Sequence, residues 1–501
     1  MPGSRTPKKA PSKALKKKRG RNAAAAVLLA RVNDQVMLEV YANGKVGAYV
    51  DGYAIEIAMI SPGAVKRAQG LAEGLPVGSF APARKPVDRE IGQLARQLAR
   101  MGLLEYSLAP PGGSQMVAIE PQTPDYWPEI AKLGSADTLA LSRFAYLRRR
   151  GNDLVLESPR SPALFRIADP QIAAALAALT TPQKIGKLRQ EKDFVGPALL
   201  GLLVACEILF KVEANSEGLR LSEGDENLVV WDFHDLLFHT HSTEGRQANP
   251  LGGRYPYVGK IEPPTAVRAP WSGTPIDLKE FSLSPGEPDS PFATLLAARR
   301  SVRDFDDATP ITLAELARLL DQAARVKLKW ESPLDFGDGS AGPILDYTSR
   351  PYPSAGSGYE LELYLTVNAC EGLARGLYHY DAERHALVQI KARADALEAQ
   401  LSAASFSMDA VTAPQILFTI AARFNRISWK YSAIAYSLIL KDVGVLLQTL
   451  YLTATDIGLG GCAIGTSNID LFEKMTGLPF HVEGPVGQFA LGRGAVGDEG
   501  S

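Results

Sequence analysis

The sequence is poor in cysteine and histidine. Its 501 residues include three cysteines, Cys206, Cys370 and Cys462, and six histidines. The cysteines are widely separated and form no CxxC pair, which argues against a disulfide framework and against a cysteine-based zinc site. A chain of this length can bury a large core without cross-links. We therefore expect a protein of a reducing compartment, the cytoplasm.

Long hydrophobic runs are also missing. No stretch approaches the roughly 18 uninterrupted apolar residues of a membrane-spanning helix, so the sequence predicts no membrane span. The apolar run from Ala23 to Ala30 has the length of a signal-peptide core, but Arg31 closes it and no convincing cleavage site follows.

Acidic residues are absent from the first 22 residues, which hold nine Lys or Arg between Arg5 and Arg21. The net charge of the whole chain is −1, so the remainder carries about −10. Proline, serine and glycine lie among the lysines, and we interpret residues 1–33 as a disordered basic tail. Such a tail can contact nucleic acid, an acidic partner or nothing, and a simply solvated tail is favoured.

Two stretches of similar pattern follow the tail. In residues 34–110, short strands with a hairpin turn at Asn43-Gly44 precede two helices, and residues 111–225 repeat the order of strands followed by helices. We interpret both as winged-helix-like modules. Because neither shows a basic recognition helix, nucleic-acid binding is disfavoured, and docking of a peptide or protein against a strand edge is expected instead.

Residues 226–285 contain half of the histidines, namely His234, His239 and His241. Their spacing does not place all three on one face of a helix, and no HExxH motif accompanies them. We predict a packed connector without a metal, followed by a proline-rich linker.

The longest apolar segment lies in the last third, residues 286–501. Residues 434–457 predict a helix of about six turns with few polar positions, covered on most of its circumference in a core or a subunit interface. Lys430 and Tyr431 precede it, and a glycine-rich turn that includes Gly460 and Gly461 follows it. A dinucleotide-binding turn needs a strand before the glycines, so this pattern is not a Rossmann fingerprint.

Three further motifs flank this helix. Arg299, Arg300, Ser301 and Arg303 place three guanidiniums and a hydroxyl within five residues, which suits an anion, although arginines at a helix end also suit the helix dipole. The stretch from Pro353 to Gly356 predicts a rigid turn with accessible backbone amides. Near the end, FALGRG at residues 489–494 bares the backbone beside Arg493.

In their order along the chain, these motifs resemble the flavin-dependent nitroreductase fold. The Lys-Tyr pair at 430–431, the stretch WDFHDLLFH at 231–239 and the two amino-terminal modules are more specifically similar to the SagB-type dehydrogenases, which oxidise azolines during maturation of thiazole- and oxazole-containing peptides. The resemblance spans about residues 36–494. It implies an α+β homodimer in which a carboxy-terminal FMN-binding domain follows two winged-helix-like modules.

The resemblance also assigns roles to residues. The FMN site that it implies consists of Arg299, Arg300, Ser301, Arg303, Pro353, Ser354, Ala355, Gly356, Gly460, Gly461 and Arg493. The first three and Arg493 would hold the phosphate, and Arg303 would face the pyrimidine edge. Residues 353–356 would line the isoalloxazine across a dimer interface, and the two glycines would let the backbone approach its reactive nitrogen. Lys430 and Tyr431 would assist deprotonation of the substrate.

The resemblance therefore predicts an FMN-dependent azoline dehydrogenase that acts on a ribosomally made precursor peptide beside cyclodehydratase subunits. Two alternatives stay open. One is an NAD(P)H-dependent reductase of nitro or enone compounds, which the same flavin cradle would support. The other is a non-catalytic assembly subunit of a peptide-modifying complex.

Overall fold

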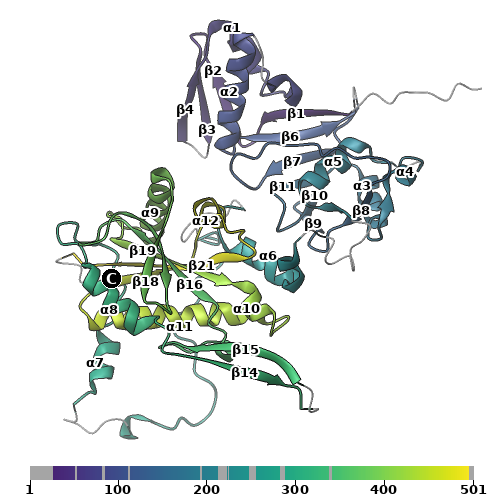
Figure 1. The fold of residues 1–501 in the computed structure, drawn as a ribbon. Helices are drawn as coiled ribbons and strands as arrows, with labels where there is room; N and C mark the ends of the chain where they lie inside the picture. Colours follow the sequence, from purple (N-terminus) through teal and green to yellow (C-terminus); the bar gives the residue numbers. More distant parts are fainter. Residues whose placement is uncertain are drawn as a thin grey trace, which may run out of the picture.

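The structure is a computed structural model of the chain (Figure 1). It describes residues 26–50, 53–81, 85–110, 113–191, 194–212, 223, 225–246, 255–281, 288–337 and 341–495. The described residues form an amino-terminal half built around a long antiparallel sheet and a carboxy-terminal domain built around a second sheet, with helix α6 between them (Figure 1).

The amino-terminal half repeats one order of elements. Each copy has a central strand, three further strands, a helix, a two-residue strand, a short helical turn, a longer helix and a final strand. The first copy comprises β1 (Val27–Val32), β2 (Val36–Val40), β3 (Lys45–Val50), β4 (Tyr53–Met59), α1 (Pro62–Gln69), β5 (Leu75–Pro76), η1 (Val77–Phe80), α2 (Pro86–Arg100) and β6 (Leu104–Ala109). The second comprises β8 (Thr138–Leu141), β9 (Tyr146–Arg150), β10 (Asp153–Glu157), β11 (Ala163–Ile167), α3 (Pro170–Ala178), β12 (Gln183–Lys184), α4 (Ile185–Leu188), α5 (Pro197–Ala205) and β13 (Leu209–Lys211).

Strand β7 (Val117–Pro121) joins the two copies. It pairs with β6 on one side and with β11 on the other, so that seven strands form one sheet in the order β5-β1-β6-β7-β11-β10-β9. The expected division between residues 110 and 111 therefore falls between two hydrogen-bonded strands. The remaining strands form two smaller sheets, β2-β3-β4 and β12-β8-β13.

The first module begins earlier in the chain than residue 34. Residues Val27–Val32, which we expected to belong to the tail, form β1 and pair along their whole length with β6. Ala30 is fully buried in the core of this half. The apolar run thus serves as an interior strand, whereas residues 1–25, where we expected the basic tail, lie outside the described part of the chain.

The connector packs against both halves. Its η3 turn (Glu226–Val230) and α6 (Phe233–Ser242) share a hydrophobic core with the carboxy-terminal domain, and Phe144 of the second module joins the same core. His239 is fully buried beside Trp231, and burial lowers its pKa to about 3. His234, in contrast, is exposed and contacts Asp232 through its Nδ1. The two side chains therefore lie in separate environments.

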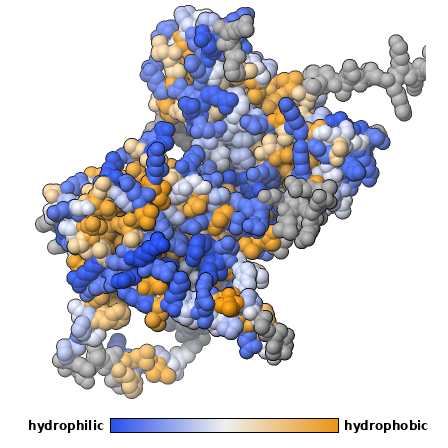
Figure 2. Space-filling view, in the orientation of Figure 1, coloured by the Kyte–Doolittle hydropathy of each residue, from blue (hydrophilic) through white to orange (hydrophobic). Residues whose placement is uncertain are grey.

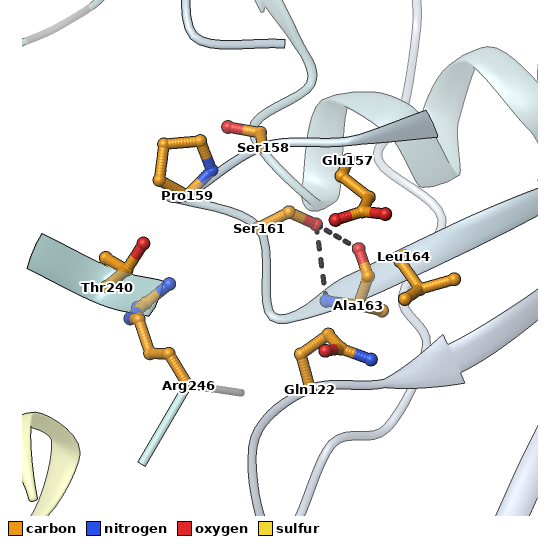
Figure 3. A pocket seen from close by; sticks show the side chains of 9 residues that line it. All are labelled: Gln122, Glu157, Ser158, Pro159, Ser161, Ala163, Leu164, Thr240 and Arg246. Carbon is orange, nitrogen blue, oxygen red and sulfur yellow. Dashed lines mark hydrogen bonds between the residues drawn. The ribbon is translucent and has the colours of Figure 1, made fainter. Parts of the chain in front are cut away.

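Arg246 joins the connector to the second module and to the carboxy-terminal domain. It donates a hydrogen bond to the carbonyl of Arg160 at 2.6 Å, and its guanidinium lies 3.4 Å from Asp470 and over the ring of Phe480. Figure 3 shows Arg246 and Thr240 facing the turn at Ser158–Ser161 and Gln122, around a small pocket between connector and module.

A six-stranded antiparallel sheet forms the centre of the carboxy-terminal domain. Its order is β18 (Ala386–Ile390), β17 (Gly376–Asp381), β16 (Leu361–Val367), β19 (Ile416–Arg423), β21 (Glu483–Gly492) and β20 (Gly460–Ile464). Helices α8 (Leu313–Ala323) and α11 (Ala435–Asp456) cover one face, and α9 (Ala394–Met408) and α12 (Ile469–Thr476) cover the other (Figure 1). Both faces of β19 are therefore buried from Ile416 to Ala422, where Thr419 is the one polar residue.

Helix α11 matches the predicted helix within one residue at each end, but its burial differs. The buried side chains form one stripe along the helix, and they are Ala435, Tyr436, Ile439, Asp442, Val443, Leu446, Leu450 and Ala454. Apolar residues outside the stripe, such as Leu440 and Leu447, are only half-buried. The exposed positions of the helix are Ser437, Lys441, Gly444, Gln448 and Asp456, so its apolar circumference is covered in part and not on all sides. By length and hydropathy, α11 is also the described helix that could cross a membrane, although its buried stripe packs on the sheet.

Three elements project from this domain. Helix α7 (Pro291–Ala298) has no buried residue, and the hairpin of β14 (Leu328–Asp335) and β15 (Ala341–Ser349) extends away from the sheet (Figure 1). The segment 255–281, which includes the short η4 turn (Lys279–Phe281), is exposed at every residue whose burial the structure describes. Figure 2 shows apolar residues on this segment.

Candidate active site

The arginine motif follows α7 and lies along the outer edge of β20. The amide of Val302 donates to the carbonyl of Gly461 at 2.9 Å, which fixes the motif against the strand. The Oγ of Ser301 lies 2.9 Å from the hydroxyl of Tyr451 on α11, and that hydroxyl accepts a hydrogen bond from the amide of Ala463. The hydroxyl of Ser301 is thereby held between a helix and a strand.

The arginine motif, together with β20 and the adjoining end of α11, forms a first corner of the candidate site, and its guanidinium groups lack carboxylate partners in the part of the chain that the structure describes. Among the described residues, Arg299, Arg300 and Arg303 have no carboxylate partner, and the guanidinium of Arg299 lies 5.2 Å from the ring centroid of Tyr451. Several unpaired cations at one place favour the binding of an anion.

Arg493 reaches the same corner but is paired. Its amide proton is accepted by the side chain of Gln415, and its guanidinium donates to Glu315 at 2.8 and 3.0 Å. Burial alone would raise the pKa of Glu315, but hydrogen bonds from Thr312 and Arg493 outweigh it and hold the pKa below its usual range. The predicted phosphate contact of Arg493 therefore competes with a carboxylate.

Gly460 and Gly461 are strand residues of β20, not part of a turn as the sequence suggested. A Cβ at Gly460 would lie 2.6 Å from Val302, and a Cβ at Gly461 would overlap the ring of Phe489. Both glycines are thus required by the packing of neighbouring side chains. Their predicted approach to a flavin stays a prediction.

Gly356, Lys430 and Tyr431 meet in a second corner. Lys430 and Tyr431 lie in the turn between α10 (Phe424–Ser428) and α11, and the Nζ of Lys430 donates to the carbonyl of Gly356 at 3.2 Å. A Cβ on Gly356 would overlap Nζ of Lys430 and lie 2.6 Å from the hydroxyl of Tyr431. Glycine at position 356 is therefore a condition for this arrangement.

The loop that carries Gly356 is conformationally strained. Gly356, Ser357 and Tyr359 all have positive φ, at 54°, 55° and 46°. For a residue with a side chain this region costs about 1–2 kcal/mol. The loop, which contains the η5 turn (Ala355–Ser357), therefore needs contacts that hold it in place.

These contacts come from two buried acids. Asp442 of α11 accepts a hydrogen bond from the amide of Ala355 and lies 2.9 Å from the Oγ of Ser354. The Oγ of Ser354 also lies 3.2 Å from Oε2 of Glu360 and accepts a hydrogen bond from the amide of Tyr359. Burial raises the pKa of Glu360 to about 7, and the charge of Asp442 adds to this rise.

The two corners lie apart on one chain. Tyr451 marks the first and Asp442 the second, and nine residues of helix separate them by about 13 Å. In Figure 1, α8 lies near one end of α11 and α10 lies near the other. The structure thus brings the arginine motif together with Gly460, Gly461 and Arg493, and it brings residues 353–356 together with Lys430 and Tyr431, without joining the two groups.

The residues of both corners suit FMN. Unpaired arginines and a fixed hydroxyl match a phosphate, and the buried Nε of Arg493 has no hydrogen-bond partner in the described part of the chain. The loop 353–356 offers backbone and a side-chain-free position beside Lys430. The two corners would serve one flavin if each came from a different subunit.

Sequence reasoning missed Glu360, Asp442 and Tyr451. Asp442 did carry a signal, because an acid in the middle of an apolar helix needs a partner. Its partner, Ser354, is 88 residues away in the chain, and no spacing rule reveals such a pair.

Two protein families match separate parts of the chain. The model of the cyanobactin oxidase ThcOx matches residues 139–248, and that of the nitroreductase family matches residues 296–493. A curated relative, "Putative nitroreductase MJ1384" of Methanocaldococcus jannaschii, is 32% identical over 171 residues, which are 34% of this chain and 76% of the relative.

Solved structures with similar parts include the Escherichia coli microcin synthetase McbBCD complex with truncated pro-MccB17 bound. The match is 19% identical, covers 56% of this chain and 99% of the matched chain, and has a TM-score of 0.37. A nitroreductase-like protein of Desulfovibrio desulfuricans in complex with FMN is 13% identical, with 43% and 92% coverage and a TM-score of 0.27. These TM-scores are low, and the sequence matches are the stronger findings.

Proposed function

We propose a function from one premise: this chain belongs to the nitroreductase family, with a cyanobactin oxidase region ahead of its nitroreductase domain. The resemblance to the SagB-type dehydrogenases agrees with both matches. The chain is accordingly an oxidoreductase. Its reaction, in our proposal, is the FMN-dependent oxidation of thiazolines or oxazolines to thiazoles or oxazoles in a ribosomally synthesised peptide.

The observation that supports this proposal most is the meeting of Lys430 and Tyr431 with the strained loop at Gly356. Conversion of an azoline into an azole removes a hydride and a proton. FMN, when bound, accepts the hydride. The proton needs a base beside the azoline ring. Lys430 is the candidate, because its Nζ lies beside the loop that would line the flavin.

Lys430 takes the proton only if its amine is neutral, and a free lysine holds its proton far above neutral pH. In one chain Lys430 is exposed, with Arg426 nearby, which donates to the carbonyl of Gly358 at 2.9 Å. Coverage of Lys430 by a second subunit and by the substrate would remove water and favour the neutral amine. The hydroxyl of Tyr431, next to the same loop, would orient the substrate.

A homodimer is part of the proposal. The support for it is apolar side chains that one chain leaves exposed or half-buried: Phe292 and Leu296 of α7, several residues of the segment 255–281, and the half-buried residues of α11 outside its stripe. A second copy would cover them. It would also bring the arginine corner of one subunit to the Lys430 corner of the other, so that FMN lies between them.

The remaining assignments concern partners and location. We infer that the repeated amino-terminal modules are winged-helix-like and dock the precursor peptide or the cyclodehydratase subunits at a strand edge. A cytoplasmic location follows from this role.

The test is a visible spectrum of the purified protein, followed by anaerobic mixing with an azoline-containing peptide. We expect a yellow protein whose flavin band bleaches while the peptide loses two hydrogens by mass. Lys430→Ala should retain FMN but lose azole formation, whereas Lys391→Ala, an exposed lysine after β18, serves as the matched control.

Other outcomes select among the alternatives. A flavin bleached only by NAD(P)H would make the protein a reductase of the general nitroreductase type. A colourless protein that cannot be loaded with FMN would contradict any flavin-linked activity and favour a non-catalytic subunit.

A further inference from the structure

The hydroxyl of Ser354 has more partners than one hydrogen can serve. The amide of Tyr359 donates to it, so one of its lone pairs is occupied. Oδ2 of Asp442 and Oε2 of Glu360 both lie within hydrogen-bond distance, at 2.9 and 3.2 Å. A hydroxyl carries a single hydrogen and can donate to only one of these two carboxyl groups.

One of the two carboxyls must therefore carry a hydrogen of its own, which it can donate to Ser354 or to the other carboxyl. Asp442 also accepts the amide of Ala355 at 2.9 Å, so its Oδ2 already serves as an acceptor. Glu360 is fully buried, and its Oε1 has no hydrogen-bond partner among the described residues. A buried carboxylate with an oxygen that accepts no hydrogen bond costs far more free energy than a neutral carboxyl at the same place.

We propose that Glu360 is a positioning residue that holds a proton at neutral pH and, through Ser354, keeps the loop 353–359 in the shape that receives the flavin. The inference rests on the proposed function in one respect, namely that FMN is the ligand that the loop binds. The raised pKa of Glu360 agrees with it.

Charged groups around the pair come from several elements. Asp442 belongs to α11, and Arg350, after β15, donates to the carbonyl of Leu361 at 3.0 Å. On β16, Glu362 is neutralised by Arg423 at 3.1 Å and by His379 at 3.2 Å. From the α10 side, Arg426 and Lys430 bind the carbonyls of Gly358 and Gly356. The cations thus bind other acceptors, and none of these bonds serves the side chain of Glu360.

Loss of the proton would leave two carboxylates against one hydroxyl. Ser354 could then keep only one of them, and the other contact would turn repulsive. Three residues of the loop have positive φ, so the loop would relax once this tether weakens. The affinity for FMN should therefore fall with rising pH because Glu360 loses its proton, independently of any titration of the flavin.

The experiment is an equilibrium titration of the full-length protein with FMN across a pH series. For the wild type we expect the affinity to fall through neutral pH by up to about tenfold per pH unit, the limit for one released proton. Glu360→Gln keeps a neutral side chain that donates to Ser354, so its profile should lose this fall. Glu398→Gln, an exposed acid of α9, should behave as the wild type.

Parallel profiles for wild type and Glu360→Gln would overturn the inference. If Glu360→Gln does not fold, Asp442→Asn replaces it: removal of the neighbouring charge should move the fall to lower pH, and an unmoved fall would contradict the proposal.

Infrared spectroscopy separates this inference from the proposed function. A protonated carboxyl has a carbonyl band distinct from the carboxylate bands, and we expect it in the wild type at neutral pH but not in Glu360→Gln. If the wild type binds no FMN at any pH, the proposed function fails. The infrared band then tests the inference by itself, and its absence at neutral pH would show that Glu360 holds no proton.

Discussion

The absence of a side chain at Gly356 leaves the space that Lys430 and Tyr431 occupy. The Cβ of an alanine would overlap Nζ of Lys430 and approach the hydroxyl of Tyr431, and alanine would also pay about 1–2 kcal/mol for the positive φ. We expect Gly356→Ala to lower kcat/KM for azoline oxidation on the order of 100-fold, the lower end for a misplaced base. Steady-state kinetics measures this loss.

The control for this variant is Gly78→Ala. Gly78 is exposed, and no heavy atom lies within 4 Å of the Cβ position. If both variants lose activity equally, or if Gly356→Ala remains fully active, the arrangement around Lys430 has no part in the reaction.

Glu360 gives the protein a pH-dependent stability. Its pKa rises from 4.5 to about 7 on folding, so between these values the native state binds a proton that the unfolded state does not. The contribution of this proton is complete below pH 4.5 and is lost as the pH rises to about 7, by up to roughly 3 kcal/mol. In urea, the stability of wild type relative to Glu360→Gln should fall over this window and stay constant above it.

Residue types and the family resemblance selected part of the candidate site, and the roles of these residues stay predictions. Arg299 to Arg303, Gly356 and Lys430 could be chosen because each chemistry is local in the sequence. The contacts of Ser354 with Asp442 could not, since they depend on how α11 crosses the loop, which is a property of the tertiary fold.

At the scale of elements, Arg246 of the connector contacts both the second module, through the carbonyl of Arg160, and α12, through Asp470. Its removal would leave Asp470 half-buried without its cation, and burial already raises the pKa of that acid. We expect Arg246→Met to destabilise the fold by about 3 kcal/mol, with partial recovery in Arg246→Met/Asp470→Asn. Differential scanning calorimetry would show the lower transition.

Arg318→Met is the matched control, since Arg318 forms an exposed pair with Asp456 at 3.8 Å and should change stability little. An Arg246→Met protein as stable as this control would mean that the module is held by its apolar contacts alone.

The elements themselves were unevenly predictable. The bounds of α11 followed from its apolar composition, because a long helix signals itself locally. The strand character of Gly460 and Gly461 could not be predicted, since it comes from pairing with β21. Strand β1 was missed because the residues of β6 that pair with it are 72 to 82 positions away in the chain.

The whole molecule exposes apolar surface that one chain does not cover. Phe292 and Leu296 of α7 are 60% and 44% exposed, and α7 packs beside α11. If a second copy covers this surface, Phe292→Glu/Leu296→Glu should convert a dimer into a monomer and release FMN with it. Light scattering coupled to size exclusion, with the absorbance of the flavin, reports both effects.

Phe406 of α9 provides the control, because it is exposed on the opposite face of the sheet, and Phe406→Glu should leave the dimer intact. A wild-type protein that is monomeric and yet retains FMN would show that one chain builds the whole site.

The seven-stranded sheet limits how this molecule can be taken apart. Since β7 is bonded to a strand of each repeat, a cut at residue 110 would expose two long bare strand edges, which invite aggregation. A protein cut at residue 110 should therefore aggregate more readily than the uncut chain, because the facing edges of β6 and β7 would lose their partners.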